Sequence, residues 1–162
     1  MLLISYQGIF DGQNYEKANT PDQIGQAFNH GYSVMVDVWR VDGKLYLGSQ
    51  QPLTEVTPEY LRGNRFWLNV RNVEMQEWIV TQPIKFYPNY FWFENDTEST
   101  PTTTSGGQII TPGTVPINNS SIIFLPEITD RGMLSTVKLQ CYGICGTYLT
   151  FIKRMRNEGM WY

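Results

Sequence analysis

The order of strand-like and helix-like segments constrains the fold of this chain more than any other feature of its sequence. A short apolar segment, Leu2 to Tyr6, precedes a helical pattern that starts at Thr20, and an alternating strand follows at residues 33–39. Thr20 is a good N-cap, the proline after it suits the first helical position, and Gly31 is a natural stop. A strand, a helix and a second strand in this order are typical of an α/β fold with a parallel sheet.

The same alternation continues along most of the chain. Residues 33–39 lead through a turn at residues 41–43 into a short strand at residues 44–47. The further expected elements are a short helix at 57–63, a strand at 65–71, a helix from Asn72, strands at 85–93, 108–111, 121–127 and 139–144, and a closing helix at 146–159. Strand candidates outnumber full-length helices, and no glycine-rich phosphate loop follows any of them. We therefore expect an α/β fold that forms a compact, partly trimmed TIM-like (β/α) barrel rather than a doubly wound sheet.

Composition bounds the number of domains and the class of partner. A length of 162 residues, of which 41% are apolar and 14% aromatic, predicts a single domain, residues 1–162, with its own core. The net charge of −3 and the lack of a basic stripe argue against a nucleic-acid partner. The apolar runs are too short for a membrane span and the first residues lack a signal-peptide pattern, so we expect cytoplasmic synthesis. Residues 97–107 are polar and of low complexity, which predicts a flexible loop.

Asp37 is a charged residue near the end of an otherwise apolar strand. Strand alternation places Ser33, Met35 and Asp37 on the inward side, and the valines between them toward the helices. By the same rule, Arg71 faces inward at the end of the neighbouring strand, residues 65–71. A buried carboxylate needs compensation, which a guanidinium supplies in bidentate geometry. We therefore predict that Asp37 and Arg71 form an ion pair or share a hydrogen-bond cluster.

Four short segments of the first half carry a family resemblance. They are Leu3 to Gly8, Ala18 to Pro21, Met35 to Asp37 and Gly48 to Gln50. In this order and spacing they resemble the glycerophosphodiester phosphodiesterase family, and the later segments FWFEND, ITPG, LPE and CYGIC resemble its small, trimmed members. The resemblance implies a TIM barrel of the PLC-like phosphodiesterase type, with its site at the C-terminal ends of the strands. It also implies hydrolysis of a phosphodiester by two histidines and a divalent cation on clustered carboxylates.

The chain departs from the family pattern at the family's catalytic and metal-binding positions. Tyr6 and Gln7 stand where the family has His-Arg, and Ser49 stands where it has its second histidine. Alanine and methionine replace two expected carboxylates, which leaves Asp37. Tyrosine and serine do not titrate near neutral pH, and one aspartate is a poor site for a hard cation. We therefore expect no catalytic residue, no metal and no cofactor, and we favour a chain without the family's enzymatic activity.

Other residues offer alternative chemistry. The cysteines, Cys141 and Cys145, lack the further ligands of a zinc site and are expected to be buried thiols. The only histidine, His30, ends the first helix and is expected to lie far from Ser49, the remaining candidate nucleophile. A pair of carboxylates could catalyse glycoside hydrolysis, although a solvated loop explains them equally well. The carboxylates concerned are Glu94, Asp96 and Glu127.

Three functional hypotheses remain open at the level of sequence. The first is a catalytically degenerate domain kept as a structural or interaction module, for example in a virion or surface layer, with other protein chains or copies of itself as partners. The second is a pocket that binds a polar or phosphate-bearing ligand through Asn19, Asp37 and Arg71, which stands where the family often has lysine. The third is an enzyme with residual phosphodiesterase activity or new chemistry. Many aromatic residues and a low charge favour the first hypothesis, because aromatic side chains are enriched at protein interfaces.

Overall fold

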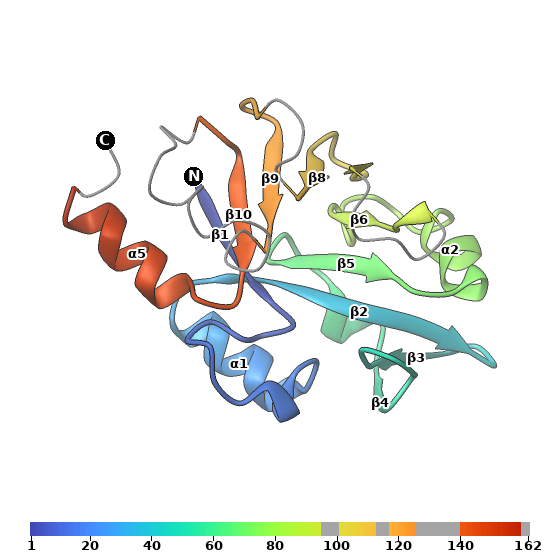
Figure 1. Ribbon diagram of the computed structural model, residues 1–162. Coiled ribbons are helices and arrows are strands. Elements are labelled where there is room, and N and C mark those ends of the chain that lie inside the picture. Colours follow the sequence, from blue (N-terminus) through green and yellow to red (C-terminus); the bar gives the residue numbers. More distant parts are fainter. Residues whose placement is uncertain (95–100, 113–116, 126–139, 160–162) are drawn as a thin grey trace.

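A single mixed sheet organises the part of the chain that the computed structural model describes, which is residues 1–94, 101–112, 117–125 and 140–159 (Figure 1). Its strands are β1 (Leu2–Tyr6), β2 (Ser33–Val41), β3 (Lys44–Leu47), β4 (Thr54–Val56), β5 (Phe66–Val70), β6 (Tyr90–Phe91), β7 (Thr102–Thr103), β8 (Ile109–Thr111), β9 (Ser121–Phe124) and β10 (Gly143–Gly146). The helices are α1 (Pro21–Asn29), α2 (Val73–Ile79) and α5 (Leu149–Asn157), with 3-10 turns at Tyr15–Lys17 and Glu59–Leu61. Within these described ranges, no helix is long and apolar enough to cross a membrane.

Parallel pairing dominates the sheet, and β2 lies at its centre. The parallel strands follow the order β6-β5-β2-β1-β10-β9-β8. β5 pairs along one edge of β2, whereas the other edge pairs first with β1 and then, antiparallel, with β3. The antiparallel strands β4 and β7 extend the sheet beyond β3 and β8. Asp37 therefore lies where β1 has ended and the pairing with β3 is about to begin.

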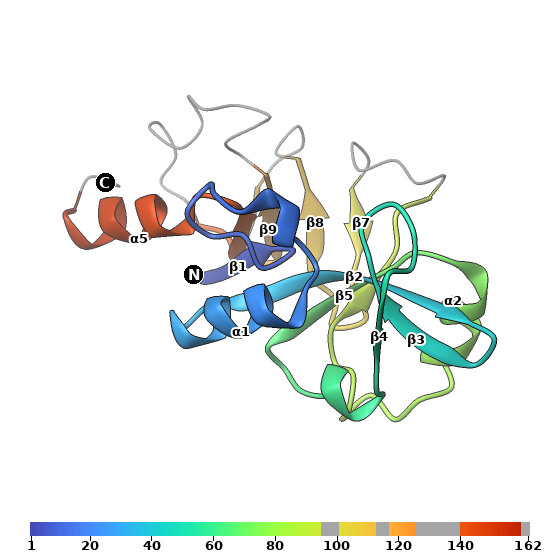
Figure 2. The same ribbon diagram turned by 90° about the horizontal axis from the view of Figure 1, so that it is seen from below.

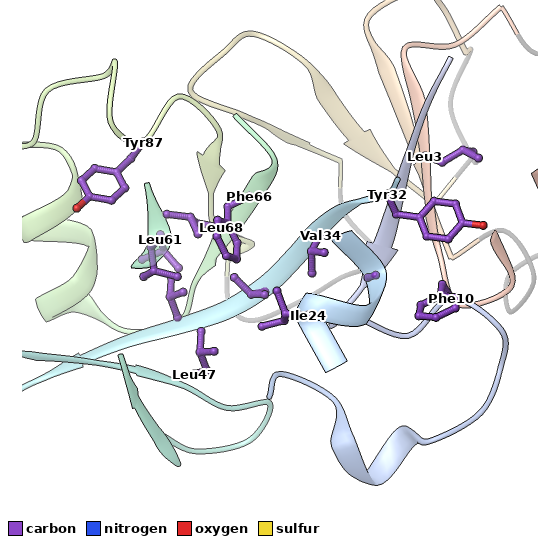
Figure 3. Close-up of a cluster of buried hydrophobic side chains, with 14 of the residues drawn as sticks. Leu3, Phe10, Ile24, Tyr32, Val34, Leu47, Leu61, Phe66, Leu68 and Tyr87 are labelled. Atoms are coloured by element: carbon purple, nitrogen blue, oxygen red, sulfur yellow. The ribbon is translucent and has the colours of Figure 1, made fainter. Parts of the chain in front are cut away.

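Each face of the sheet carries its own apolar cluster, as strand alternation requires. The valines of β2 join the face that α1, α2 and α5 cover, and Figure 3 shows this cluster around Val34, Ile24 and Leu68. Met35 and Trp67 belong to the opposite face. Seen from below, α1 and α5 lie on the same side of the sheet (Figure 2).

The sheet is curled into a half-barrel. Phe93, just after β6, contacts Phe124 of β9 with ring centroids 5.8 Å apart, although β6 and β9 are far apart in the strand order. A backbone hydrogen bond of 2.8 Å from Ser105 to the carbonyl of Tyr90 also joins β6 to the turn after β7. The two ends of the strand order are therefore close in space.

The expected TIM-like (β/α) barrel is wrong. The structure is a curled mixed sheet, and its described residues contain only three short α-helices. Of the described connections between parallel strands, those from β1 to β2 and from β5 to β6 carry an α-helix, whereas β2 reaches β5 through the β3–β4 hairpin. The connection from β8 to β9, residues 112–120, is shorter than the roughly 12 residues that a helical crossover needs. The described residues thus supply strands for a barrel but not the alternating helices that define a TIM fold.

Several local predictions are confirmed, and others differ from the structure. Thr20 caps α1 by accepting the Gln23 amide, and Asn72 caps α2 in the same way. Of residues 85–93 only β6 is a strand, whereas β4 and β7 were not expected. Residues 101–107 contain β7 and a turn, residues 97–100 lie outside the described part, and the mobility of this loop stays a prediction, as does the single domain.

Candidate functional site

Asp37, in the middle of β2, lies at the centre of a buried polar cluster beside the C-terminal ends of β1 and β5. Only 1% of Asp37 is exposed. Its Oδ2 accepts hydrogen bonds from Gln7 Nε2 at 2.6 Å and Asn19 Nδ2 at 3.0 Å. Its Oδ1 accepts from Asn69 Nδ2 at 2.7 Å and from Arg71 Nη1 at 3.3 Å. A carboxylate offers about four lone-pair directions. Four donors therefore occupy the hydrogen-bonding capacity of this carboxylate.

Two left-handed residues bring the amides of β1 and its loop to Asp37. Gln7 follows β1 with φ of 57° and donates its backbone N–H to Met35 O at 2.7 Å. Asn19 has φ of 58° and donates its backbone N–H to Gln7 O at 2.9 Å. Asn19 Oδ1 also accepts the Asp37 backbone N–H at 3.0 Å. Because a backbone N–H can only donate, this bond fixes the Asn19 amide with Nδ2 toward the carboxylate.

Ser49 and Arg71 form the outer side of the cluster. Asn19 Nδ2 also donates to Ser49 Oγ at 2.9 Å. Trp39 Nε1 donates to Gly48 O at 2.6 Å, which holds the end of β3 beside β2. The Arg71 guanidinium lies over the Trp39 ring, 5.3 Å from its centroid, and its side chain is 12% exposed. Arg71 is therefore held by a carboxylate and by an aromatic face.

The electrostatics of the cluster reflect competition between burial and hydrogen bonding. Burial raises the pKa of Asp37 above its ordinary value of 3.8. The hydrogen bond from Asn19, the charge of Arg71 and the hydrogen bonds from Gln7 and Asn69 act in the opposite direction. Every neighbour of the carboxylate oxygens named above is a donor, which suits the ionised form. The ion pair predicted between Asp37 and Arg71 is present, whereas the predicted ligand-binding role of Asn19, Asp37 and Arg71 stays a prediction.

The cluster can hold a buried charge, but it is poorly suited to proton transfer or metal binding. In the described part of the chain, no three His, Cys, Asp or Glu side chains gather closely enough to hold a metal ion. Tyr6 lies beside the cluster at the level of Met35, and its ring contacts Phe124 edge-on at 5.3 Å. Of the three residues at the family's catalytic positions, Tyr6 packs against an aromatic ring, Gln7 donates to the Asp37 carboxylate, and Ser49 accepts a hydrogen bond from Asn19.

His30 lies at the opposite end of α1 from the cluster. Asn19 adjoins the first turn of α1, and His30 caps its last turn, roughly 14 Å further along the axis of a nine-residue helix. There His30 is exposed, contacts Phe10 with the two ring planes tilted by 34°, and lies parallel to the ring of Tyr32. As the sequence predicted, His30 therefore lies too far from Ser49 to serve as its base.

The remaining candidates lie elsewhere in the fold. Cys141 and Cys145 are buried thiols, as expected. Glu94 is exposed next to β6. Asp96 and Glu127 lie outside the described residues.

Two members of the cluster were not predicted as partners of Asp37. Asn69 pairs with Asp37 in the β2–β5 register, so strand alternation on its own could have identified it. Gln7 reaches the carboxylate because its backbone is left-handed. The sequence signal for that conformation is the glycine that follows Gln7, which itself has φ of 86°.

Comparisons with known proteins leave the family undecided. No family model matches the chain, and neither does any curated protein or solved structure. The resemblance to glycerophosphodiester phosphodiesterases therefore stays a prediction, and the fold that it implied is corrected above.

Proposed function

We propose that the chain acts as a structural or interaction module and not as a metal-dependent phosphodiesterase. The observation that carries this proposal is the four-donor environment of Asp37. A divalent cation would have to displace amide or guanidinium donors before it could reach either carboxylate oxygen. Calcium and magnesium need several oxygen ligands, preferably anionic, and one enclosed carboxylate is a poor substitute.

The same contacts argue against an anion-binding site at this rim. Arg71 is the positive charge of the cluster, and its ion pair with Asp37 at 3.3 Å offsets that charge. A phosphate would therefore meet a neutralised pair rather than an unpaired guanidinium. Neither the comparisons nor the geometry supports a place in a virion.

Exposed apolar residues at the ends of α2 support the interaction part of the proposal. Val73, the first residue of α2, is 64% exposed, and Val80, its C-cap, is 56% exposed. Ile84, which follows the helix, is also largely exposed. Exposed apolar side chains that lie near one another in sequence suit a surface that meets another protein chain.

A hydrolysis assay tests the proposal. The purified chain is incubated with a glycerophosphodiester and millimolar calcium or magnesium, and released alcohol is measured against a protein-free control. We expect no hydrolysis above that control. Metal-dependent hydrolysis that Asp37→Asn abolishes and Asp22→Asn, at an exposed position of α1, preserves would contradict the proposal.

A further inference from the structure

A surface pocket of about 270 Å³ lies at the seam between β6 and β7, and none of the residues that contact Asp37 lines it. Tyr90, Phe91, Trp92, Glu94 and residues 102–105 line it. Hydrogen bonds fix the seam: Tyr90 N donates to Ser105 Oγ at 2.9 Å, and Thr102 Oγ1 donates to Trp92 O at 2.8 Å. The walls are therefore anchored on both sides of the pocket.

Two aromatic rings form one side of this pocket. Phe91 and Phe93 belong to the same apolar cluster as Met35 and Trp67. Strand alternation directs Tyr90 and Trp92 to the other face, where both are half-buried and pack against the cluster that the helices cover. The rings of Tyr90 and Trp92 are nearly parallel, with an interplanar angle of 14° and centroids 6.5 Å apart. Aromatic faces carry negative charge density and attract groups with partially positive hydrogens. The C–H groups on one face of a pyranose ring are such groups.

Residues 102–105, which also line the pocket, all carry hydroxyl groups. Those of Thr102, Thr104 and Ser105 already donate to protein acceptors, and Thr103 is exposed. Glu94 adds an exposed carboxylate, and the described residues of the lining include no lysine, arginine or histidine. An anionic ligand would therefore be repelled, whereas a neutral ligand with many hydroxyl groups would find acceptors.

We propose that this pocket binds one neutral hexopyranose, either free or at the end of a glycan. The rings of Tyr90 and Trp92 stack on its apolar face, and Glu94 and Thr103 hydrogen-bond its hydroxyl groups. The volume suits a single sugar ring, because pockets for drug-sized ligands start at about 300 Å³. This site goes beyond the proposed interaction module and depends on none of the Asp37 cluster.

Saturation-transfer NMR of the intact chain tests the proposal. The probes are glucose, galactose, mannose and N-acetylglucosamine, with glucuronate as an anionic control and adenosine as an aromatic control. We expect transfer to the ring C–H protons of at least one neutral sugar, with a millimolar dissociation constant because the ligand has only about 12 heavy atoms. The absence of transfer to every neutral sugar, or stronger transfer to glucuronate or adenosine, would overturn the proposal.

Variants localise the binding. Thr103→Arg places a long side chain at an exposed lining position and is expected to weaken binding at least about tenfold. Thr150→Arg makes the same substitution at an exposed position of α5 and is expected to leave binding unchanged. Glu94→Gln removes the carboxylate without changing its shape and is expected to weaken binding several-fold. Equal affinity in Thr103→Arg and the unaltered chain would place any sugar binding elsewhere and overturn the proposal.

Discussion

Replacing Asp37 by alanine removes the acceptor on which the polar cluster converges. Three amides, from Gln7, Asn19 and Asn69, and the Arg71 guanidinium all donate to this carboxylate. All three amide residues are buried, so their donors cannot simply turn to solvent. Asp37→Ala therefore leaves several buried donors and one charge without their acceptor.

The size of the loss follows from the burial of the two charged partners. Breaking a buried ion pair costs about 3–5 kcal/mol, because the remaining charge is stranded. An exposed pair contributes only about 0–1 kcal/mol. Asp37 is 1% exposed and the Arg71 side chain 12%, so the pair belongs near the buried limit. We expect Asp37→Ala to lower the free energy of unfolding by about 3–5 kcal/mol.

Urea denaturation followed by tryptophan fluorescence measures this loss, since the chain contains five tryptophans. Asp22→Ala is the matched control, because Asp22 is exposed in the first turn of α1, and it is expected to cost less than about 1 kcal/mol. A loss below about 1 kcal/mol for Asp37→Ala would place the carboxylate at a wet rim and refute the reasoning.

Three further perturbations test the cluster and the elements around it. Burial raises the pKa of Asp37 above 3.8, so its titration contributes stability that is complete below about pH 3.8 and is lost as pH rises through the folded pKa. In urea titrations, the unaltered chain should lose stability relative to Asp37→Asn as pH rises through that window. A relative gain in stability would show that the pKa of Asp37 is not raised. Glu74 accepts hydrogen bonds from two backbone N–H groups of the β2–β3 turn, at 2.9 and 3.2 Å. Glu74→Ala should therefore lower the free energy of unfolding by about 1–2 kcal/mol. An unchanged urea midpoint would show that these hydrogen bonds do not stabilise the turn. A Cβ at Gly48 would clash with Gln51 O, so Gly48→Ala should lower the stability to thermal unfolding by about 2–3 kcal/mol. Gly25→Ala, with open space around it in α1, should be neutral or stabilising, and equal effects of the two substitutions would contradict this expectation.

Local periodicity and capping were sufficient to predict the centre of the fold. Period-two alternation placed Asp37 and Arg71 on one face of neighbouring strands, and their ion pair is present. The Thr20 cap predicted the start of α1, and the helix expected from Asn72 is α2. These features depend on residues close in sequence, so the sequence pattern contains them directly.

The closure of the sheet depends on information that local patterns do not contain. The alternation of strands and helices suggested a TIM barrel, but the helix that such a fold needs between β8 and β9 has no room in residues 112–120. β7 was not predicted because its polar sequence is typical of a loop. In the fold, β7 pairs with β8, and Thr102 of β7 donates to Trp92 O next to β6. The approach of Gln7 and Asn19 to Asp37 required two left-handed residues that are not glycine, for which sequence gives little warning.

The response of the melting temperature to divalent cations tests most directly whether Asp37 binds a metal. Asp37 accepts four protein donors, and we propose that it binds no metal. We expect millimolar calcium or magnesium to leave the melting temperature of the unaltered chain unchanged, and Asp37→Ala to melt at a lower temperature with or without the cation. A clear rise in melting temperature with either cation, abolished by Asp37→Ala, would show that the cluster is a metal site and would contradict the account.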